Sequence, residues 1–214
     1  TLDVTATLVS GTGALVGTVT KTAVAGVATF TNLGIGGYTN QSYTIRFTAV
    51  FNSTNITVDS ATITVTAGTA TKLVITQQAA GFVSGANFTT QPKVTVQDYY
   101  GNTVTSWATA ITVALTGGST LGGTTTATPA SGVATFSGLS ATGLTTNSNG
   151  LTFSSGVLAT DSQTFTLSAG TATKLAFKTQ AAGFVNRTNF TTQPEIYIQD
   201  SANNTVTSST ASVV

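Results

Sequence analysis

The sequence contains no histidine, cysteine or methionine and few charged residues of either sign. Without imidazole or thiol groups, the usual general base at neutral pH, the cysteine nucleophile and the commonest transition-metal ligands are missing. The six carboxylates are scattered, the nearest pair in sequence being Glu195 and Asp200, whereas acid–base catalysis by carboxylates needs two that lie close together. We therefore expect no catalytic residue, no metal ligand and no cofactor, and we interpret the protein as non-enzymatic.

Charge is also sparse. Seven basic and six acidic residues give a formal net charge of +1, and the basic residues form no run. Nucleic-acid binding depends on clustered Lys and Arg, so we expect no nucleic-acid partner. Charged residues make up 6% of the chain and threonine nearly a quarter, whereas typical soluble domains are about 25% charged. A surface wetted by hydroxyl groups favours an extracellular, cell-surface protein that is glycosylated or packed against copies of itself.

Long apolar runs and a leader are missing as well. No stretch of about 18 apolar residues occurs, so we expect no membrane insertion within this segment. The chain starts at Thr1 without a signal peptide, which predicts either a processed form or a window of a longer protein. Because there is no cysteine, each folding unit has to depend on its own hydrophobic core rather than on disulfides.

The sequence repeats itself internally. Residues 67–73 recur unchanged at 169–175, and the same offset of 102 relates 88–92 to 190–194, 97–98 to 199–200 and 102–106 to 204–208. A second offset, of 106, relates 26–30 to 132–136. A period near 100 residues is typical of separate domains in tandem. We predict a module at 1–66 that lacks its first strands, a complete module at 67–168, and the first strands of a further module at 169–214.

Within each period the pattern is that of β-strands. Tyr43, Ile45 and Phe47 alternate with more polar residues, a period of two with one mostly apolar face. Shorter alternating pieces follow, separated by glycine-rich turns such as 100–102 and 131–132. Short strands, such turns and about 100 residues per module predict an all-β fold of tandem immunoglobulin-like β-sandwich modules strung end to end.

Three segments carry a resemblance: Ala-Gly-Thr-Ala-Thr-Lys-Leu at 67–73, the stretch from Phe88 to Ser106, and Gly-Val-Ala-Thr-Phe-Ser-Gly-Leu at 132–139. Together they resemble the bacterial immunoglobulin-like (Big, invasin-like) repeats of long secreted surface proteins. The resemblance covers essentially the whole chain and implies tandem sandwiches along a stalk or fibre. It implies no ligand, since a fold does not decide a function. The third module departs from the pattern where Asn203 replaces Gly101, and asparagine also tolerates a left-handed turn.

The two incomplete modules are complementary. The segment 169–214 carries five apolar side chains on strands whose partner sheet is missing: Leu175, Phe177, Ile196, Ile198 and Val206. Leaving such side chains in water forfeits about 1.5–3 kcal/mol each. Our hypothesis is that these assembly strands complete residues 1–66 of a neighbouring copy by β-strand addition, which gives a head-to-tail homopolymer. The alternative is that the sequence is a window of one continuous repeat chain.

Several other residues are candidates for surface roles. Seven sequons are candidate N-glycosylation sites, at Asn40, Asn52, Asn55, Asn87, Asn186, Asn189 and Asn203. Asp98 and Asp200 precede tight turns, where an Asp that bonds the turn backbone is favoured over a Ca²⁺ ligand, because Ca²⁺ needs six to eight oxygens. Tyr99, Tyr100 and Trp107 have no aromatic equivalents at 201, 202 and 209. They are a candidate patch for a ligand such as a glycan or, as we favour, for packing.

The preferred function is that of a structural subunit of an extracellular filament, surface thread or stalk, with copies of itself as partners. One alternative is an adhesin module whose loops bind glycans or cell-surface receptors. Another is an S-layer or phage-surface decoration module.

Overall fold

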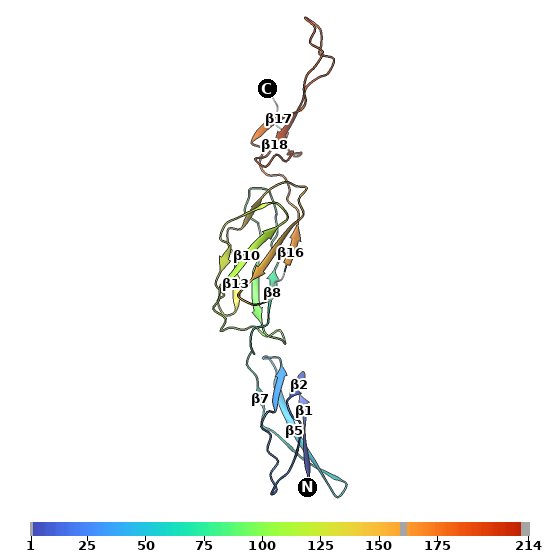
Figure 1. The fold of residues 1–214 in the computed structure, drawn as a ribbon, viewed down its shortest axis with the longest axis vertical. Helices are drawn as coiled ribbons and strands as arrows, with labels where there is room; N and C mark the ends of the chain where they lie inside the picture. The colour runs from blue at the N-terminus through green and yellow to red at the C-terminus, as the bar shows by residue number, and fades with distance from the viewer. Residues whose placement is uncertain (1, 159–161, 211–214) are drawn as a thin grey trace. The chain divides into compact units, whose positions relative to one another are not determined.

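The computed structural model describes residues 2–158 and 162–210, and all regular secondary structure within these ranges is β (Figure 1). The predicted modules therefore include a few residues, at 1, 159–161 and 211–214, that lie outside the described ranges. The prediction of an all-β fold is confirmed for the described residues. These residues contain no helix that could cross a membrane.

The chain divides into two compact units. The first consists of Thr1–Thr71 together with Gln97–Ser106, and the second of Lys72–Val96 together with Trp107–Val214. The short segment 97–106, which belongs by sequence to the second repeat, thus lies with the strands of the first repeat.

The first unit contains two sheets. Its strands are β1 (Asp3–Ser10), β2 (Gly13–Val16), β3 (Thr20–Thr22), β4 (Gly34–Gly37), β5 (Ser42–Phe51), β6 (Thr54–Asp59) and β7 (Ile63–Thr64). The larger sheet has the order β3-β1-β5-β6, with β7 also paired to β5, and the smaller one pairs β2 with β4. All of these pairs are antiparallel.

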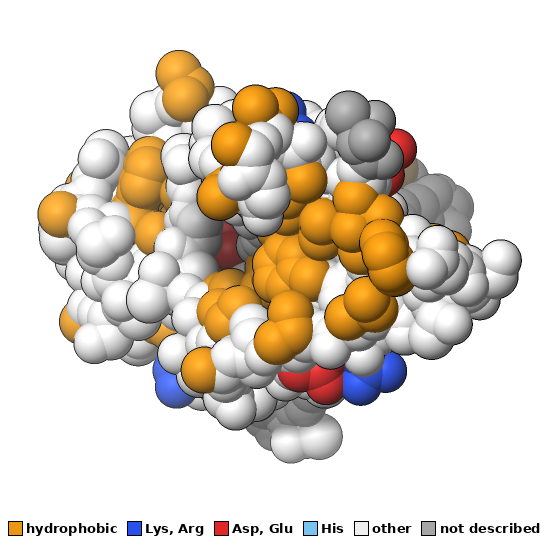
Figure 2. All heavy atoms as spheres, turned by 90° about the horizontal axis from the view of Figure 1, so that it is seen from below, with side chains coloured by type: hydrophobic (Ala, Val, Ile, Leu, Met, Phe, Trp, Pro, Cys, Tyr) orange, Lys and Arg blue, Asp and Glu red, His pale blue; other side chains and the backbone are white. Residues whose placement is uncertain are grey.

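The alternation expected at 43–51 is present but only partly buried. In β5, Tyr43 and Ile45 are buried and Phe47 is half-buried, while Phe51, at the turn into β6, is exposed. Asn52 and Ser53 form that turn with φ angles of 47° and 63°, the left-handed pair typical of a two-residue hairpin. Figure 2, a view from below, shows a group of hydrophobic side chains on the surface. The exposed ones of the first unit include Val24, Val27, Val50, Phe51, Ile56 and Val58.

The second unit has more strands. They are β8 (Lys72–Gln77), β9 (Lys93–Gln97), β10 (Ile111–Thr116), β11 (Thr120–Gly122), β12 (Thr126–Ala127), β13 (Val133–Thr135), β14 (Ser140–Thr142), β15 (Asn149–Ser154), β16 (Ser162–Phe165), β17 (Lys174–Thr179) and β18 (Glu195–Gln199). One sheet has the order β13-β9-β8 and another the order β12-β10-β15-β16, while β11 pairs with β14 and β17 with β18.

The core of the second unit lies between its two larger sheets, in a sandwich-like arrangement (Figure 1). The buried apolar side chains of the β13-β9-β8 sheet are Leu73, Val94, Val96 and Ala134, and those of the facing sheet are Ile111, Val113, Leu151, Phe153 and Phe165. Ring contacts link different segments, with Phe82 stacked on Phe165 at 4.0 Å between centroids and Phe136 packed on Phe153 at 5.4 Å. Burial of this apolar surface is the main stabilising contribution.

Candidate functional site

The turn from Asp98 to Asn102 is held by one carboxylate. Asp98 Oδ1 accepts a hydrogen bond from the Asn102 backbone N–H at 2.9 Å, and Oδ2 accepts bonds from the Asn102 side-chain amide and the Gly68 N–H, both at 2.9 Å. The Asp98 N–H also donates to the Asn102 carbonyl at 3.0 Å. We call residues 98–102 the Asp–Asn turn. The structure shows Asp98 in the turn-bonding role that the sequence favoured.

The Asn102 side chain reaches from this turn to the loop after β4. Its Nδ2 donates to the Gly37 carbonyl at 2.9 Å, and its Oδ1 accepts from the Thr39 backbone N–H at 2.9 Å. Asn102 is buried, so these bonds are shielded from water. The amide therefore joins two segments that lie more than 60 residues apart, and it recognises main-chain atoms only.

The same arrangement occurs a second time, one repeat later. Asp200 accepts bonds from the Asn204 N–H, the Asn204 amide and the Gly170 N–H at 2.8–2.9 Å. Asn204 Nδ2 donates to the Gly143 carbonyl at 2.9 Å, and Oδ1 accepts from the Thr145 N–H at 2.8 Å. Two copies with the same partners show that the Asp–Asn turn is a recurring contact between a repeat and the loop of the repeat before it in sequence.

Electrostatics favours the ionised carboxylate at both turns. Burial opposes the charged form of Asp98, but hydrogen bonds from the Asn102 side chain and from the backbone N–H groups of Gly68, Asn102 and Tyr100 outweigh it, so the pKa of Asp98 is lowered. The pKa of Asp200 is lowered in the same way, against its burial, by Asn204 and by the N–H groups of Gly170, Asn204 and Ala202. Residues 2–158 and 162–210 contain no cluster of three or more potential metal-ligating side chains.

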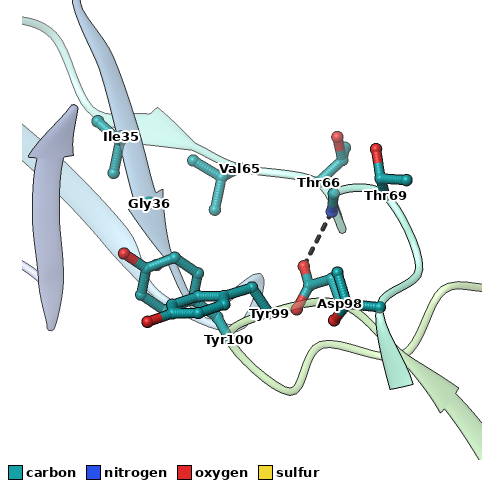
Figure 3. Close-up of a pocket in the computed structure, with 11 residues that line it drawn as sticks. Ile35, Gly36, Val65, Thr66, Thr69, Asp98, Tyr99 and Tyr100 are labelled. Atoms are coloured by element: carbon teal, nitrogen blue, oxygen red, sulfur yellow. Dashed lines mark hydrogen bonds between the residues drawn. The ribbon is translucent and has the colours of Figure 1, made fainter. Parts of the chain in front are cut away.

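A pocket of about 330 Å³ lies in the first unit beside the Asp–Asn turn. Its walls come from the end of β4, from the chain after β7 and from the turn, and include Ile35, Gly36, Val65, Thr66, Gly68, Asp98, Tyr99 and Tyr100. Figure 3 shows the rings of Tyr99 and Tyr100 on the side opposite Ile35 and Val65, and the hydrogen bond that Asp98 accepts from Gly68. Its lining is mostly apolar, which suits a hydrophobic occupant.

Of the three candidate aromatic residues, Tyr99 and Tyr100 lie together in the first unit and Trp107 belongs to the second. Tyr99 is 78% exposed. Tyr100 packs edge-on against Tyr38, with centroids 6.1 Å apart, and its ring lies so close to Gly36 that a side chain at that position would collide with it. Trp107 belongs to the second unit, where its Nε1 donates to Ser155 Oγ at 3.0 Å. Tyr100 and Trp107 therefore have packing contacts, whereas Tyr99 is largely exposed although its ring packs edge-on against Tyr100, with centroids 5.2 Å apart.

The predicted assembly strands form the hairpin of β17 and β18. Leu175 pairs with Ile198 and Phe177 with Ile196 in the strand register, so the four side chains lie on one face. Leu175, Phe177 and Ile196 are exposed, while Ile198 and Val206 are half-buried. A shallow apolar pocket of about 270 Å³ lies between Leu175, Phe177 and Ile196. The hairpin thus presents an uncovered hydrophobic face.

The seven sequon asparagines are all exposed. Asn52 lies in the tight turn between β5 and β6, and Asn203, with a φ of 72°, accepts a hydrogen bond from Lys174 Nζ. Exposure makes each side chain accessible in this structure, and glycosylation itself stays a prediction.

Sequence reasoning missed the residues that make the Asp–Asn turns bind a neighbouring loop. Asn102 and Asn204 did appear within the repeated stretch, but only as part of a hairpin. The available signal was that Gly68, Asp98 and Asn102 all recur at an offset of 102 while Gly37 recurs at 106. Their partners are backbone groups far away in the chain, and because every residue has a backbone, residue types do not identify such partners.

The sequence matches no protein-family model and no curated protein. Among solved structures, it is similar to a β-glucuronidase from Parabacteroides merdae with glycerol in its active site, at 13% identity and a TM-score of 0.34. It is also similar to a β-glycosidase from Bacteroides vulgatus, at 11% identity and a TM-score of 0.41. Each alignment covers 77% of this chain and 21% of the other chain. The chain thus corresponds to a small part of those enzymes, and likenesses this weak carry no argument about function.

Proposed function

We propose that the chain is a non-enzymatic structural subunit of an extracellular filament, surface thread or stalk, built from tandem immunoglobulin-like sandwiches. Consecutive sandwiches are completed by β-strand complementation between copies or by continuation of the same repeat chain. The resemblance of its repeats to bacterial immunoglobulin-like (Big, invasin-like) repeats, its cell-surface type of composition and its lack of histidine and cysteine support this proposal.

One observation carries the proposal: the hairpin β17–β18 is a second copy of β8–β9, but without a cover. Leu73, Val94 and Val96 are buried beneath the β12-β10-β15-β16 sheet. Their equivalents Leu175 and Ile196 are exposed. An exposed apolar face of this kind marks an interaction site. The sheet that covers β8–β9 indicates the kind of partner that would cover β17–β18.

The first unit has the complementary deficiency. Its sheet β3-β1-β5-β6 corresponds in order to β12-β10-β15-β16, and its Phe30–Phe47 pair corresponds to Phe136–Phe153. It contains no counterpart of β8 and β9 among its described residues. A sheet without a hairpin and a hairpin without a sheet fit each other, and a head-to-tail contact of this type propagates into a filament.

The strand register of the second unit gives a direct test. There, Ala134 on β13 pairs with Val94 on β9, and the repeat offsets convert this pair into Ala28 and Ile196. Because the chain has no cysteine, the single variants Ala28→Cys and Ile196→Cys can be mixed and oxidised. We expect a disulfide-linked dimer on a non-reducing gel, and none for Ala28→Cys mixed with a cysteine at the exposed residue Val157.

The mass of the native material under fully denaturing conditions separates the two forms of the proposal. A mass near 21.5 kDa, plus any sugar, indicates a subunit that assembles between copies. A mass many times larger indicates one continuous chain of repeats. A purified chain that stays monomeric at high concentration, forms no Ala28–Ile196 cross-link and is not part of a longer chain would refute both forms.

A binding role is the second candidate, and Tyr99 is the residue that favours it. Its ring is exposed beside a pocket, and exposed aromatic rings stack on sugars. In an adhesin module, Tyr99→Ala abolishes glycan binding but leaves assembly unchanged. If the chain is only a structural subunit, Tyr99→Ala does not reduce glycan binding relative to the unmodified chain.

A further inference from the structure

In the second unit, a loop fills the place that corresponds to the first unit's pocket beside the Asp–Asn turn. The loop from Ala80 to Thr90 lies along β14 and the chain after β16. The Ser84 N–H donates to the Ser168 carbonyl at 2.9 Å, the Ser168 N–H donates to the Phe82 carbonyl at 2.9 Å, and the Gly85 N–H donates to the Ala141 carbonyl at 2.9 Å. Gly170 is buried directly beneath the Ser84 carbonyl, where no Cβ would fit.

The corresponding place in the first unit is open. Ile35–Gly37 corresponds to 141–143 and 65–68 to 167–170, and all of these first-unit residues except Ala67 line the 330 Å³ pocket (Figure 3). Gly68 is exposed, whereas Gly170 is buried. Within 2–158 and 162–210, no backbone hydrogen bond is made by Thr66, the counterpart of Ser168. The first unit thus has the receiving surface without a loop on it.

The chain carries a second copy of the loop, at 182–192, which is already folded in the same way. The Ala80–Thr90 bridge recurs as Ala182–Thr192. The ring contact of Phe82 with Phe88, at 5.0 Å and 74°, recurs in Phe184 with Phe190 at 5.1 Å and 75°. The turn bond from Ala86 to Val83, at 3.1 Å, recurs from Thr188 to Val185 at 3.2 Å.

This second copy is uncovered. Phe184 is 73% exposed and Val185 is 63% exposed, although both lie in a loop whose backbone matches that of the covered copy. A loop that already has its bound conformation loses little conformational entropy on binding. The segment 182–192 therefore already has the conformation in which the covered copy packs against its neighbours.

The differences between the two copies match the pocket of the first unit. Arg187 replaces Gly85 and has a φ of 64°, close to the 79° of that glycine, although a left-handed backbone is unfavourable for arginine. A Cβ built on Gly85 lies 4.0 Å from Thr142 Oγ1. The counterpart of Thr142 is Gly36, over which the ring of Tyr100 lies. An arginine at this place meets an aromatic ring, which is a favourable cation–π arrangement.

We propose that the loop 182–192 of one copy docks into the pocket of the first unit of a second copy, with Val185 against Thr66 and Arg187 beside Tyr100. Phe184 then packs on Ile63, the counterpart of Phe165. This inference rests on the proposed assembly between copies and specifies its second contact, in addition to the hairpin face. Asn186 takes the place of the buried residue Ser84, so docking and an N-glycan on Asn186 exclude each other.

Disulfide trapping tests the contact. The bridge between Val83 and Ser168 converts by the repeat offset into Val185 and Thr66, and directly paired residues lie within the Cα separation that a disulfide requires. The single variants Thr66→Cys and Val185→Cys are mixed at a concentration at which the unmodified chain assembles, and then oxidised. We expect a cross-linked dimer. The control is Thr66→Cys mixed with a cysteine at Val157, which is 98% exposed on an unrelated turn, and it gives no dimer.

The strand cross-link between Ala28 and Ile196 distinguishes the two ways in which the experiment can fail. If that cross-link forms and Thr66–Val185 does not, the docking loop is refuted while assembly by strand complementation stands. If neither forms, the docking loop and assembly between copies are both refuted, and only the continuous-chain form of the proposed function stands. A Thr66–Val185 dimer that also forms at dilutions where the unmodified chain is monomeric reflects random collision and contradicts the proposal.

A second measurement tests the pairing of Arg187 with Tyr100. Arg187→Gly restores the residue found in the covered copy, so the variant keeps the loop conformation. We expect Arg187→Gly and Tyr100→Ala each to weaken assembly by about 2- to 5-fold. The double variant should be no weaker than the stronger single variant, whereas multiplicative effects would show that the two residues do not interact.

Discussion

The hairpins β8–β9 and β17–β18 are two copies of one sequence element in different surroundings. Leu73 is 4% exposed and its counterpart Leu175 is 56% exposed. The turns that follow the two hairpins have the same carboxylate and amide hydrogen bonds at Asp98 and Asp200. The hydrogen bonds of the turn are therefore the same in both copies, whereas the burial of the hairpin differs.

The facing sheets show the same relation from the other side. Phe136 and Phe153 lie 5.4 Å apart at 57°, and Phe30 and Phe47 lie 5.3 Å apart at 57°. The first pair is buried beneath a hairpin, whereas Phe30 and Phe47 are only half-buried. Phe136 follows β13 and Phe153 lies on β15, so the pair joins two sheets, and its geometry recurs in the first unit although the rings there are less protected from water. In the second unit, the hairpin β8–β9 contributes buried apolar side chains to the core over this pair.

The largest effect that can sharpen this comparison is expected at the ring pair. Phe153→Ala removes a fully buried ring and should destabilise the second unit by about 3–5 kcal/mol, whereas Phe47→Ala should cost the first unit less because Phe47 is half-buried. Urea unfolding followed by the fluorescence of Trp107, the single tryptophan, reports on the second unit. Hydrogen exchange reports on the first unit. Equal losses in the unassembled chain would contradict the comparison.

The hairpin residues give the next largest effect. Leu73→Ala should cost about 2–5 kcal/mol in the second unit. Leu175→Ala should have little effect on the stability of the unassembled chain, but it should raise the concentration required for assembly. Sedimentation of both variants over a concentration series measures this. A Leu175→Ala variant that assembles like the unmodified chain would show that the exposed face is not an interface.

The two Asp–Asn turns should respond alike, since their partners are equivalent. Asn204→Ala leaves the Thr145 N–H without its amide acceptor and removes one donor from the Gly143 carbonyl, which still accepts a bond from Ser84 Oγ at 3.1 Å; the expected loss is about 1–3 kcal/mol for a buried hydrogen-bonding group. Asn102→Ala should cost a similar amount in the first unit. The matched control is Asn203→Gly, which alters an exposed neighbour of Asn204, suits the φ of 72° there and restores the residue found at Gly101. A much smaller loss at one of the two turns would indicate that water replaces the amide there.

The smallest effect that we expect is the contribution of Asp200 to the pH dependence of stability. The pKa of Asp200 in the folded chain is lowered from its ordinary value of 3.8, so its contribution to stability is present above that value and is lost as the pH falls through the lower folded-state pKa. Unfolding monitored at Trp107 should be unaffected by Asp200 ionisation between pH 7 and about pH 5. In Asp200→Asn, part of the acid sensitivity below that range should disappear. Identical acid profiles would exclude this carboxylate as the cause.

The sequence predicted the strands well because their signal is local. The alternation around Tyr43 and Ile45, the glycine-rich turns and the exact repeat at 67–73 were sufficient for an all-β chain with repeated elements. The turn role of Asp98 also follows from neighbouring residues. The reach of Asn102 to Gly37 could not be predicted, because its partners are backbone atoms more than 60 positions away.

The loop at 182–192 was not singled out from the sequence, although residues 181–185 and 189–194 repeat 79–83 and 87–92 unchanged. Gly85 and Arg187 have opposite conformational preferences, so the sequence alone argues against a shared backbone at this position. Only the φ angles and the matching ring geometry show that the loop keeps its shape. The separation of Trp107 from Tyr99 and Tyr100 likewise depends on which segment joins which unit.

The Asn102 and Asn204 amides bind only the main chain of the loops they contact. Every residue type presents the same carbonyl and, proline excepted, the same N–H, so loop side chains can change while this contact persists. A gene that encodes such an array can therefore gain, lose or exchange whole repeats by recombination without a compensating change in the adjacent repeat. Length becomes a property that evolution can adjust independently of the sequence of any single domain.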